Sequence, residues 1–172
     1  VYQALDREYG FGRANFFIQN VQRYSKPLLE LVAYHRSDVL DFGTISRLED
    51  GDICEKAMKF FPFIVGEKNF VPILEEENNK TVENSDEGAF TVSFPGGKIR
   101  KNKAIFILAH DAESTVLSLY GAYLLLGISP PLKNKKTFSI IERMFFSKDA
   151  PGQDMAEEVQ RVIKYCIFKL KN

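Results

Sequence analysis

Residues 89–115 carry the sequence AFTVSFPGGKIRKNKAIFILAHDAEST, and this stretch decides the fold that we predict. Apolar and polar residues alternate over 89–94, which is typical of a strand with one buried face. Pro-Gly-Gly at 95–97 supplies turn residues, and the chain from Lys98 runs into a strongly apolar segment that ends at Ala109. The stretch therefore predicts a β-hairpin whose second strand continues into the core.

Helices are predicted on both sides of this hairpin. Asp111 is a favoured N-cap residue, so a helix should follow over 112–126. Apolar residues recur at steps of three and four along 2–34, which predicts a long helix with a kink at Pro27, where one backbone donor is missing. Further helices, the last of them amphipathic, are expected over 52–60, 138–146 and 155–170.

The remaining segments complete the predicted architecture. The apolar run FPFIV at 61–65 indicates a buried strand, and the acidic stretch 75–88 a solvated loop. We therefore predict the α/β class, with a long kinked N-terminal helix packed on a small mixed sheet, a β-hairpin lid and further helices. The length suits one ligand-binding or sensor domain over 1–172. Because the chain begins with Val1, it also fits a piece of a longer protein.

Composition restricts the partners of the chain. Lys plus Arg and Asp plus Glu both number 23, so no global basic field attracts nucleic acid. A local basic cluster, such as the one over 98–103, could still hold a small anionic ligand. No stretch approaches the roughly 20 apolar residues of a membrane span. We expect a soluble cytoplasmic domain. A full-length protein could carry a membrane segment or an effector domain in addition.

The sequence contains no clear catalytic or metal-binding pattern. Cys54 and Cys166 are too few for a disulfide framework or a zinc site, so we expect both to be reduced core residues. Phosphate-binding loops and nucleophile elbows are absent from the sequence. His110, at a strand-to-helix junction, is the histidine best placed for a ligand. We predict no enzyme, no cofactor and no metal. A small hydrolase that uses His110 is one of two alternatives.

Three stretches in order resemble the ligand-binding domain of STING, the cyclic-dinucleotide receptor. Residues 12–28 are similar to its first long helix, with a Gly-x-Ala start and the aromatic pair Phe16-Phe17. Residues 60–71 resemble its first sheet strand with the loop after it. The hairpin and residues 105–115 resemble its lid and the polar turn from strand to helix.

The resemblance implies a homodimer that holds a cyclic dinucleotide second messenger across its two-fold axis, with a role in innate immunity and antiviral defence. Ligand-stabilised closure would signal to an attached effector. Aromatic residues would stack on the bases, basic lid residues would pair with phosphates and polar turn residues would read base edges. The ligand-binding positions that it implies are Phe17 and Asn20 on the first helix, Lys98 and Arg100 on the lid, and His110, Ser114 and Thr115 at the turn.

A protein-interaction or scaffold domain without a small ligand is the main alternative. It predicts a monomer or heteromer without a polar cavity, whereas the receptor hypothesis predicts an obligate homodimer with a polar cleft.

Overall fold

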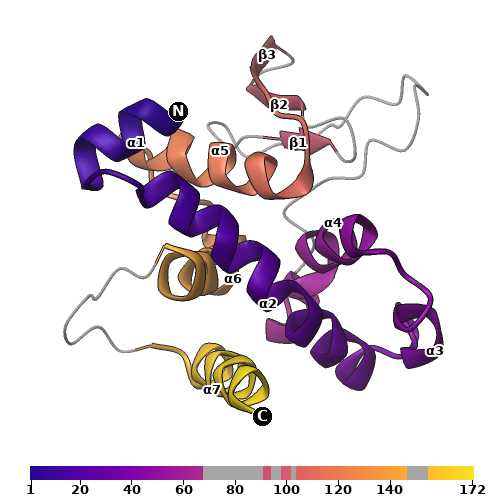
Figure 1. The fold of residues 1–172 in the computed structure, drawn as a ribbon. Helices are drawn as coiled ribbons and strands as arrows, with labels where there is room; N and C mark the ends of the chain where they lie inside the picture. The colour runs from indigo at the N-terminus through magenta and orange to yellow at the C-terminus, as the bar shows by residue number, and fades with distance from the viewer. Residues whose placement is uncertain (68–90, 94–97, 102–103, 147–154) are drawn as a thin grey trace.

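Helices form most of the chain in the computed structural model, which describes residues 1–67, 91–93, 98–101, 104–146 and 155–172 (Figure 1). For the strands it describes the backbone alone. The α-helices are α1 (Tyr2–Tyr9), α2 (Arg13–His35), α3 (Phe42–Ile45), α4 (Asp50–Phe60), α5 (Ala112–Leu125), α6 (Lys135–Ile140) and α7 (Glu157–Lys171). Tighter or wider helical turns are the 3-10 helices η1 (Phe61–Val65) and η2 (Leu132–Asn134) and the π-helix η3 (Ile141–Phe145).

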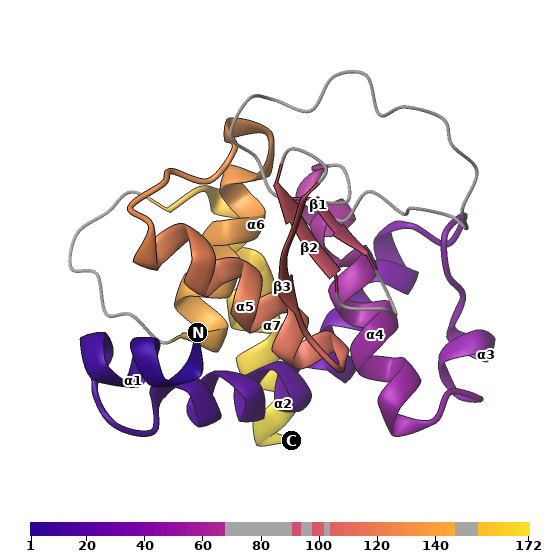
Figure 2. The same ribbon diagram turned by 90° about the horizontal axis from the view of Figure 1, so that it is seen from above.

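Helix α2 runs along one side of the molecule, and one face of it packs on most of the other helices (Figures 1 and 2). It packs against α1, α4, α5, α7, η1 and η3. Phe17, Val21, Leu28 and Val32 are completely buried, and their spacing of four and seven residues places them on one face of α2. The helix continues through Pro27, as predicted.

The single helix predicted over 2–34 is in fact two helices, because the chain turns at Gly10-Phe11-Gly12. Gly10 has a φ of 107° and Gly12 a φ of 82°, and residues with a side chain rarely adopt such values. A Cβ at either glycine would meet no atom within 4 Å. These glycines therefore allow the backbone conformation of the turn rather than a close approach of another segment.

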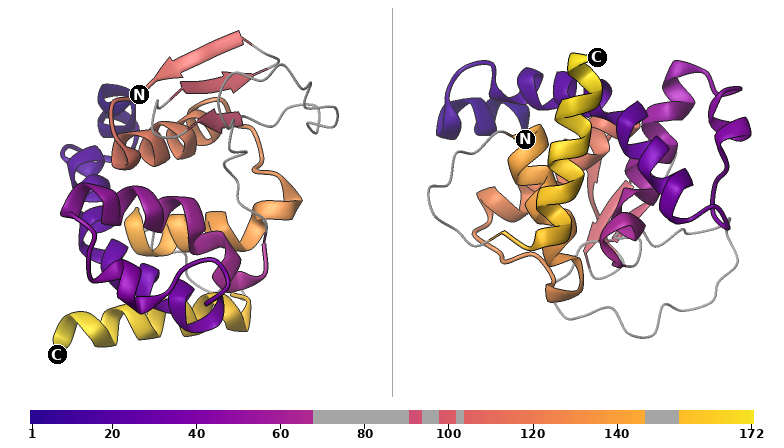
Figure 3. Two further views of the ribbon diagram at one scale, coloured as in Figure 1. Left: turned by 90° about the vertical axis from the view of Figure 1, so that its right-hand side faces the viewer. Right: turned by 90° about the horizontal axis from the view of Figure 1, so that it is seen from below.

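Three short strands form an antiparallel sheet at one edge of the molecule (Figure 3). They are β1 (Thr91–Ser93), β2 (Lys98–Lys101) and β3 (Ala104–Leu108), in the order β1-β2-β3. Thr91 lies opposite Arg100, and Ile99 lies opposite Ile107 with a register shift after it. Strand β2 contacts α5. The predicted turn at 95–97 and the predicted loop over 75–88 lie outside the described residues.

The predicted α/β fold, with a long helix packed on a small mixed sheet under a β-hairpin lid, is wrong. The body is helical, the described strands are short and antiparallel, and the elements that pack most extensively on α2 are α4, α7 and η1. Residues 61–65, predicted as the first strand, are η1. Pro62 lacks the N–H that a sheet ladder needs, and Phe61 and Val65 are buried within the helical core.

Aromatic rings fill the centre of this helical core. The rings of Phe17 and Tyr120 stack with their centroids 5.9 Å apart, and Phe17 meets Phe145 edge to face at 5.7 Å. Phe61 meets Phe145 at 6.1 Å. The hydroxyl of Tyr120 is buried without a hydrogen-bond partner among the described residues. Burial raises the pKa of this phenol, with a smaller contribution from the charge of Glu142.

Glu67 joins two parts of the chain that are far apart in sequence. Its carboxylate accepts hydrogen bonds from the backbone N–H groups of Lys136 (2.7 Å) and Thr137 (2.8 Å) and from the Thr137 hydroxyl (2.7 Å). These N–H groups belong to the first turn of α6, where no carbonyl of the same helix can accept them. Glu67 therefore caps α6 from outside and fixes its position.

Helix α7 lies along the outer side of the molecule (Figures 1 and 3). Val159, Val162 and Cys166 are buried against the body. Glu30 of α2 holds the helix through an ion pair with the Lys169 amine at 3.3 Å. As predicted, Cys54 and Cys166 are both unpaired and buried. Within the described residues, no helix is both long enough and apolar enough to cross a membrane.

Candidate functional site

The polar turn predicted as a ligand site begins α5, and its hydroxyl groups stabilise that helix. Asp111 is the N-cap, as predicted, and its carboxylate accepts the Ser114 N–H at 2.7 Å. The Ser114 hydroxyl accepts the N–H groups of His110 (3.3 Å) and Asp111 (3.2 Å), which completes a capping box. The Thr115 hydroxyl donates to the Asp111 carbonyl at 2.6 Å. Ser114 and Thr115 are both buried.

Two acidic side chains, Asp111 and Glu113, lie at this turn. Gln22 of α2 donates a hydrogen bond to Glu113 at 3.2 Å. Burial raises the pKa of the Tyr2 phenol, and the charges of Asp111 and Glu113 raise it further. His110 is exposed, and its imidazole forms no hydrogen bond or ion pair with a described residue. Asp111 and Glu113 therefore place negative charge at this turn.

Neither cysteine is a nucleophile in this structure. Burial raises the pKa of the Cys54 thiol to about 11, and Glu113 contributes a nearby negative charge. Burial likewise raises the pKa of Cys166 to about 12. Both thiols are therefore protonated at neutral pH, and the thiol form is unreactive. The described part of the chain holds no group of three or more His, Cys, Asp or Glu residues that could bind a metal ion.

The two ligand positions predicted on the first helix lie inside the core. Phe17 is completely buried and stacks on Tyr120. Asn20 is 7% exposed, and its amide donates to the Phe145 carbonyl at 3.1 Å. In the single chain, neither side chain faces an open surface.

The basic positions predicted on the lid lie in strand β2. The backbone of Lys98 pairs with Ser93 and Leu108, and that of Arg100 pairs with Thr91. The structure describes only the backbone of these two residues. The structure thus brings together three of the predicted site residues on one turn, namely His110, Ser114 and Thr115, and places Phe17 and Asn20 elsewhere, in the core.

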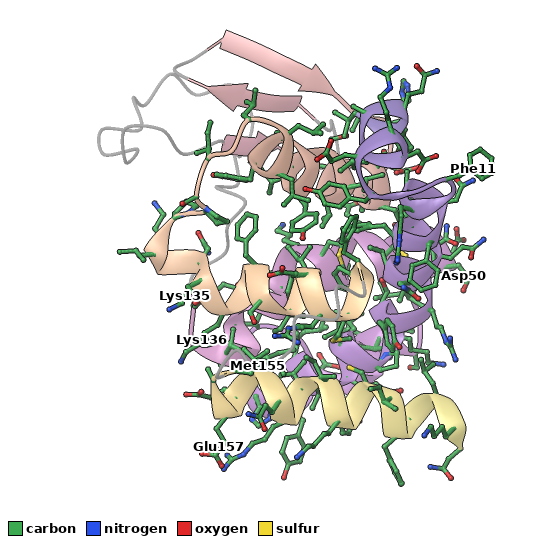
Figure 4. The ribbon with its side chains drawn as sticks, turned by 90° about the vertical axis from the view of Figure 1, so that its left-hand side faces the viewer. Phe11, Asp50, Lys135, Lys136, Met155 and Glu157 are labelled. Atoms are coloured by element: carbon green, nitrogen blue, oxygen red, sulfur yellow. The ribbon has the colours of Figure 1, made fainter. Side chains whose placement is uncertain are left out.

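A different feature, which the sequence analysis missed, stands out at the turn between α1 and α2. Phe11 is fully exposed, at 101% of its reference area, and its ring points away from the body (Figure 4). Hydrogen bonds fix the backbone around it. The Asp6 carboxylate accepts the Ala14 N–H at 3.0 Å, and the Phe16 N–H donates to the Gly12 carbonyl at 3.0 Å. The Arg13 guanidinium lies 5.9 Å from the centre of the Phe16 ring.

One signal in the sequence could have indicated this turn. Phe11 stands between two glycines and falls outside the apolar stripe of residues 2–34. An aromatic residue off the stripe, held between residues that favour a turn, has no obvious place in the core. The pattern Gly-Phe-Gly does not reveal, however, that the ring would be completely exposed.

Comparisons with protein-family models, with curated proteins and with solved structures gave no match.

Proposed function

We propose that this chain is a non-catalytic protein-interaction domain, and that Phe11 is the side chain that enters a pocket of a partner protein. The observation that carries the proposal is the complete exposure of Phe11 on a fixed turn. Large apolar side chains are usually buried. At protein interfaces, a few aromatic and arginine residues supply most of the binding free energy when a pocket encloses them.

The construction of the turn supports this role. Binding is weakened by the entropy lost when a loop becomes ordered, and a loop that is already ordered avoids that loss. Here the positive-φ glycines allow the turn, and the N–H groups of Gly10 and Ala14 both donate hydrogen bonds to Asp6 and restrain the turn. Phe16, which is 40% exposed, and Arg13 lie next to it and extend the patch with residue types that are enriched at interfaces.

The polar groups described above support a binding role over a catalytic one. Ser114 and Thr115 are bonded to the backbone at the start of α5, and the Cys54 thiol is protonated at neutral pH. A hydroxyl or thiol nucleophile needs a neighbouring base or a lowered pKa. The described residues provide neither to these three groups.

Site-specific photo-crosslinking tests the proposal in the cells that make the protein. Phe11 is replaced by the photoreactive analogue p-benzoylphenylalanine, and Gln19, an exposed residue of α2, is replaced in the matched control. We expect a discrete covalent adduct with one protein from position 11 and none from position 19. Absence of an adduct, or the same adducts from both positions, would contradict the proposal.

The resemblance to STING supports a second candidate, a receptor for a cyclic dinucleotide. By this resemblance, His110, Ser114 and Thr115 would contact the ligand, and of these three residues His110 is exposed. Because Phe17 and Asn20 are buried in the single chain, their contact with a ligand would require α2 to rearrange.

Thermal unfolding in the presence of cyclic di-GMP and cyclic GMP-AMP tests this candidate. A ligand at one hundred times its dissociation constant should add about 2.7 kcal/mol to the stability of the folded state. An unchanged melting temperature with both dinucleotides would remove the receptor hypothesis and leave the interaction domain.

A further inference from the structure

Helix α7 is locally basic in a chain whose net charge is zero. Residues 157–172 contain four cationic side chains, and their two glutamates, Glu157 and Glu158, stand at the start of the helix. Within a Debye length of about 8 Å, such a local charge acts on a partner whatever the net charge of the whole protein. The cations are Arg161, Lys164, Lys169 and Lys171.

Spacing along the helix separates these residues from the buried face. Lys164, Phe168 and Lys171 follow one another at steps of four and three, so they share one face of α7. This face lies opposite the residues that pack on the body, Val159, Val162 and Cys166, and Lys164, Phe168 and Lys171 are all exposed. The same steps lead back to Arg161 and Glu157, so the face also carries one carboxylate. Phe168 is 64% exposed.

Ion pairs neutralise two of the four cations. Arg161 pairs with Glu157 on the same helix, and Lys169 pairs with Glu30 of α2. Lys164 and Lys171 form no ion pair with a described residue. Two uncompensated ammonium groups therefore stand on either side of an exposed aromatic ring. Ile167, which is 40% exposed, lies beside it.

We propose that the exposed face of α7 around Lys164, Phe168 and Lys171 docks on the surface of an anionic lipid membrane. Lysine side chains reach the negatively charged headgroups, while Phe168 and Ile167 enter the boundary between headgroups and acyl chains. The proposal is independent of the role of Phe11 and goes beyond it, because it concerns another helix and another class of partner.

The shape of this face favours a membrane over a nucleic acid. Proteins that bind single strands without sequence preference use a groove lined by several aromatic rings, on which successive bases stack. Helix α7 lies on the outside of the molecule (Figure 3). Its exposed side offers the ring of Phe168 on the convex surface of a helix. A flat bilayer can meet such a surface along its length.

Vesicle co-sedimentation of the purified chain tests the proposal. Vesicles of phosphatidylcholine with phosphatidylserine are compared with vesicles of phosphatidylcholine alone, at low and at high salt. One lysine near an anionic membrane changes binding roughly fivefold. The double variant K164E/K171E should therefore bind the anionic vesicles at least about 25-fold more weakly. Phe168→Ser should weaken binding by about tenfold.

The double variant K133E/K135E is the matched control, because it changes the net charge equally. Lys135 starts α6 and lies on the same side of the molecule as Glu157 (Figure 4). Glu157 begins α7, whereas Lys171 ends it. We expect this control to bind anionic vesicles as the unchanged chain does. Circular dichroism establishes that each variant is folded.

Three outcomes would overturn the proposal. The first is no binding to the anionic vesicles at low salt. The second is equal loss of binding in K164E/K171E and K133E/K135E. The third is binding of a single-stranded oligonucleotide, lost in K164E/K171E, without binding of vesicles. None of these outcomes bears on Phe11, so the interaction proposal would stand or fall separately.

Discussion

At the scale of single residues, a substitution of Asp111 tests whether this side chain stabilises α5 as its N-cap. Its carboxylate is the partner of the Ser114 N–H, so Asp111→Ala leaves that donor unsatisfied. Loss of an N-cap side chain costs about 1 kcal/mol, and we expect this decrease in the free energy of unfolding, measured in urea. Glu8→Ala, at an exposed position on α1, is the control. Equal stability of the two variants would mean that the cap contributes nothing.

Tyr120 permits a second measurement at this scale. Its hydroxyl is buried without a partner among the described residues, and a buried polar group without a hydrogen bond is destabilising. Tyr120→Phe keeps the ring stacked on Phe17 and removes only the hydroxyl. We expect the free energy of unfolding to stay constant or to rise by up to about 1 kcal/mol. A decrease of that size would show that the hydroxyl has a partner, such as a bound water molecule.

At the scale of elements, the position of α6 depends on Glu67. Glu67→Gln keeps the size of the side chain but removes the charge that faces the helix N-terminus. It also weakens the hydrogen bonds with Lys136 and Thr137. We expect a loss of about 1–3 kcal/mol in the free energy of unfolding. Glu49→Gln is the control, since Glu49 stands at the N-cap of α4 without a side-chain bond to it. Indistinguishable stabilities would contradict the capping role.

Some of these elements could be predicted from the sequence, and others could not. Helices α5 and α7 lie close to their predicted bounds, because an N-cap residue and a regular apolar stripe depend only on neighbouring residues. Residues 61–65 are different. A short apolar run fits a buried strand or a buried helical turn equally well, and only the surrounding helices decide between them.

Site prediction had the same limit. The polar turn of His110, Ser114 and Thr115 follows from the local sequence, and it exists. Whether its hydroxyls face a ligand or the helix backbone depends on hydrogen bonds that a single sequence does not specify. The burial of Phe17 and the exposure of Phe11 are likewise tertiary facts, because both are phenylalanines near the start of one helical region.

At the scale of the whole molecule, the two buried thiols make the free energy of unfolding decrease at alkaline pH. Cys54 and Cys166 have an ordinary pKa of 9.0, which burial raises to about 11 and about 12 in the folded state. Well below pH 9 the folded and the unfolded chain both keep the thiol protons, so the thiols contribute their full stabilisation. Above pH 9 the unfolded chain releases these protons first. The free energy of unfolding therefore falls as the pH rises through the pKa values of the folded state. Urea unfolding should show this decrease, with a smaller slope in Cys54→Ala. An identical slope would contradict the assignment.

The oligomeric state of the whole chain separates the two candidate functions. A receptor of the STING kind places its ligand between two copies, so it must dimerise. The buried face of α2 instead packs on other helices of the same chain, and the aromatic core lies within one chain. We therefore expect sedimentation velocity to give a single species near 19.6 kDa at micromolar concentrations.

Phe11→Ser should sediment in the same way, because Phe11 makes no contribution to the core. A stable dimer in the unchanged chain that Phe11→Ser dissociates would show that the partner of Phe11 is a second copy. A dimer that this substitution leaves intact would favour the receptor.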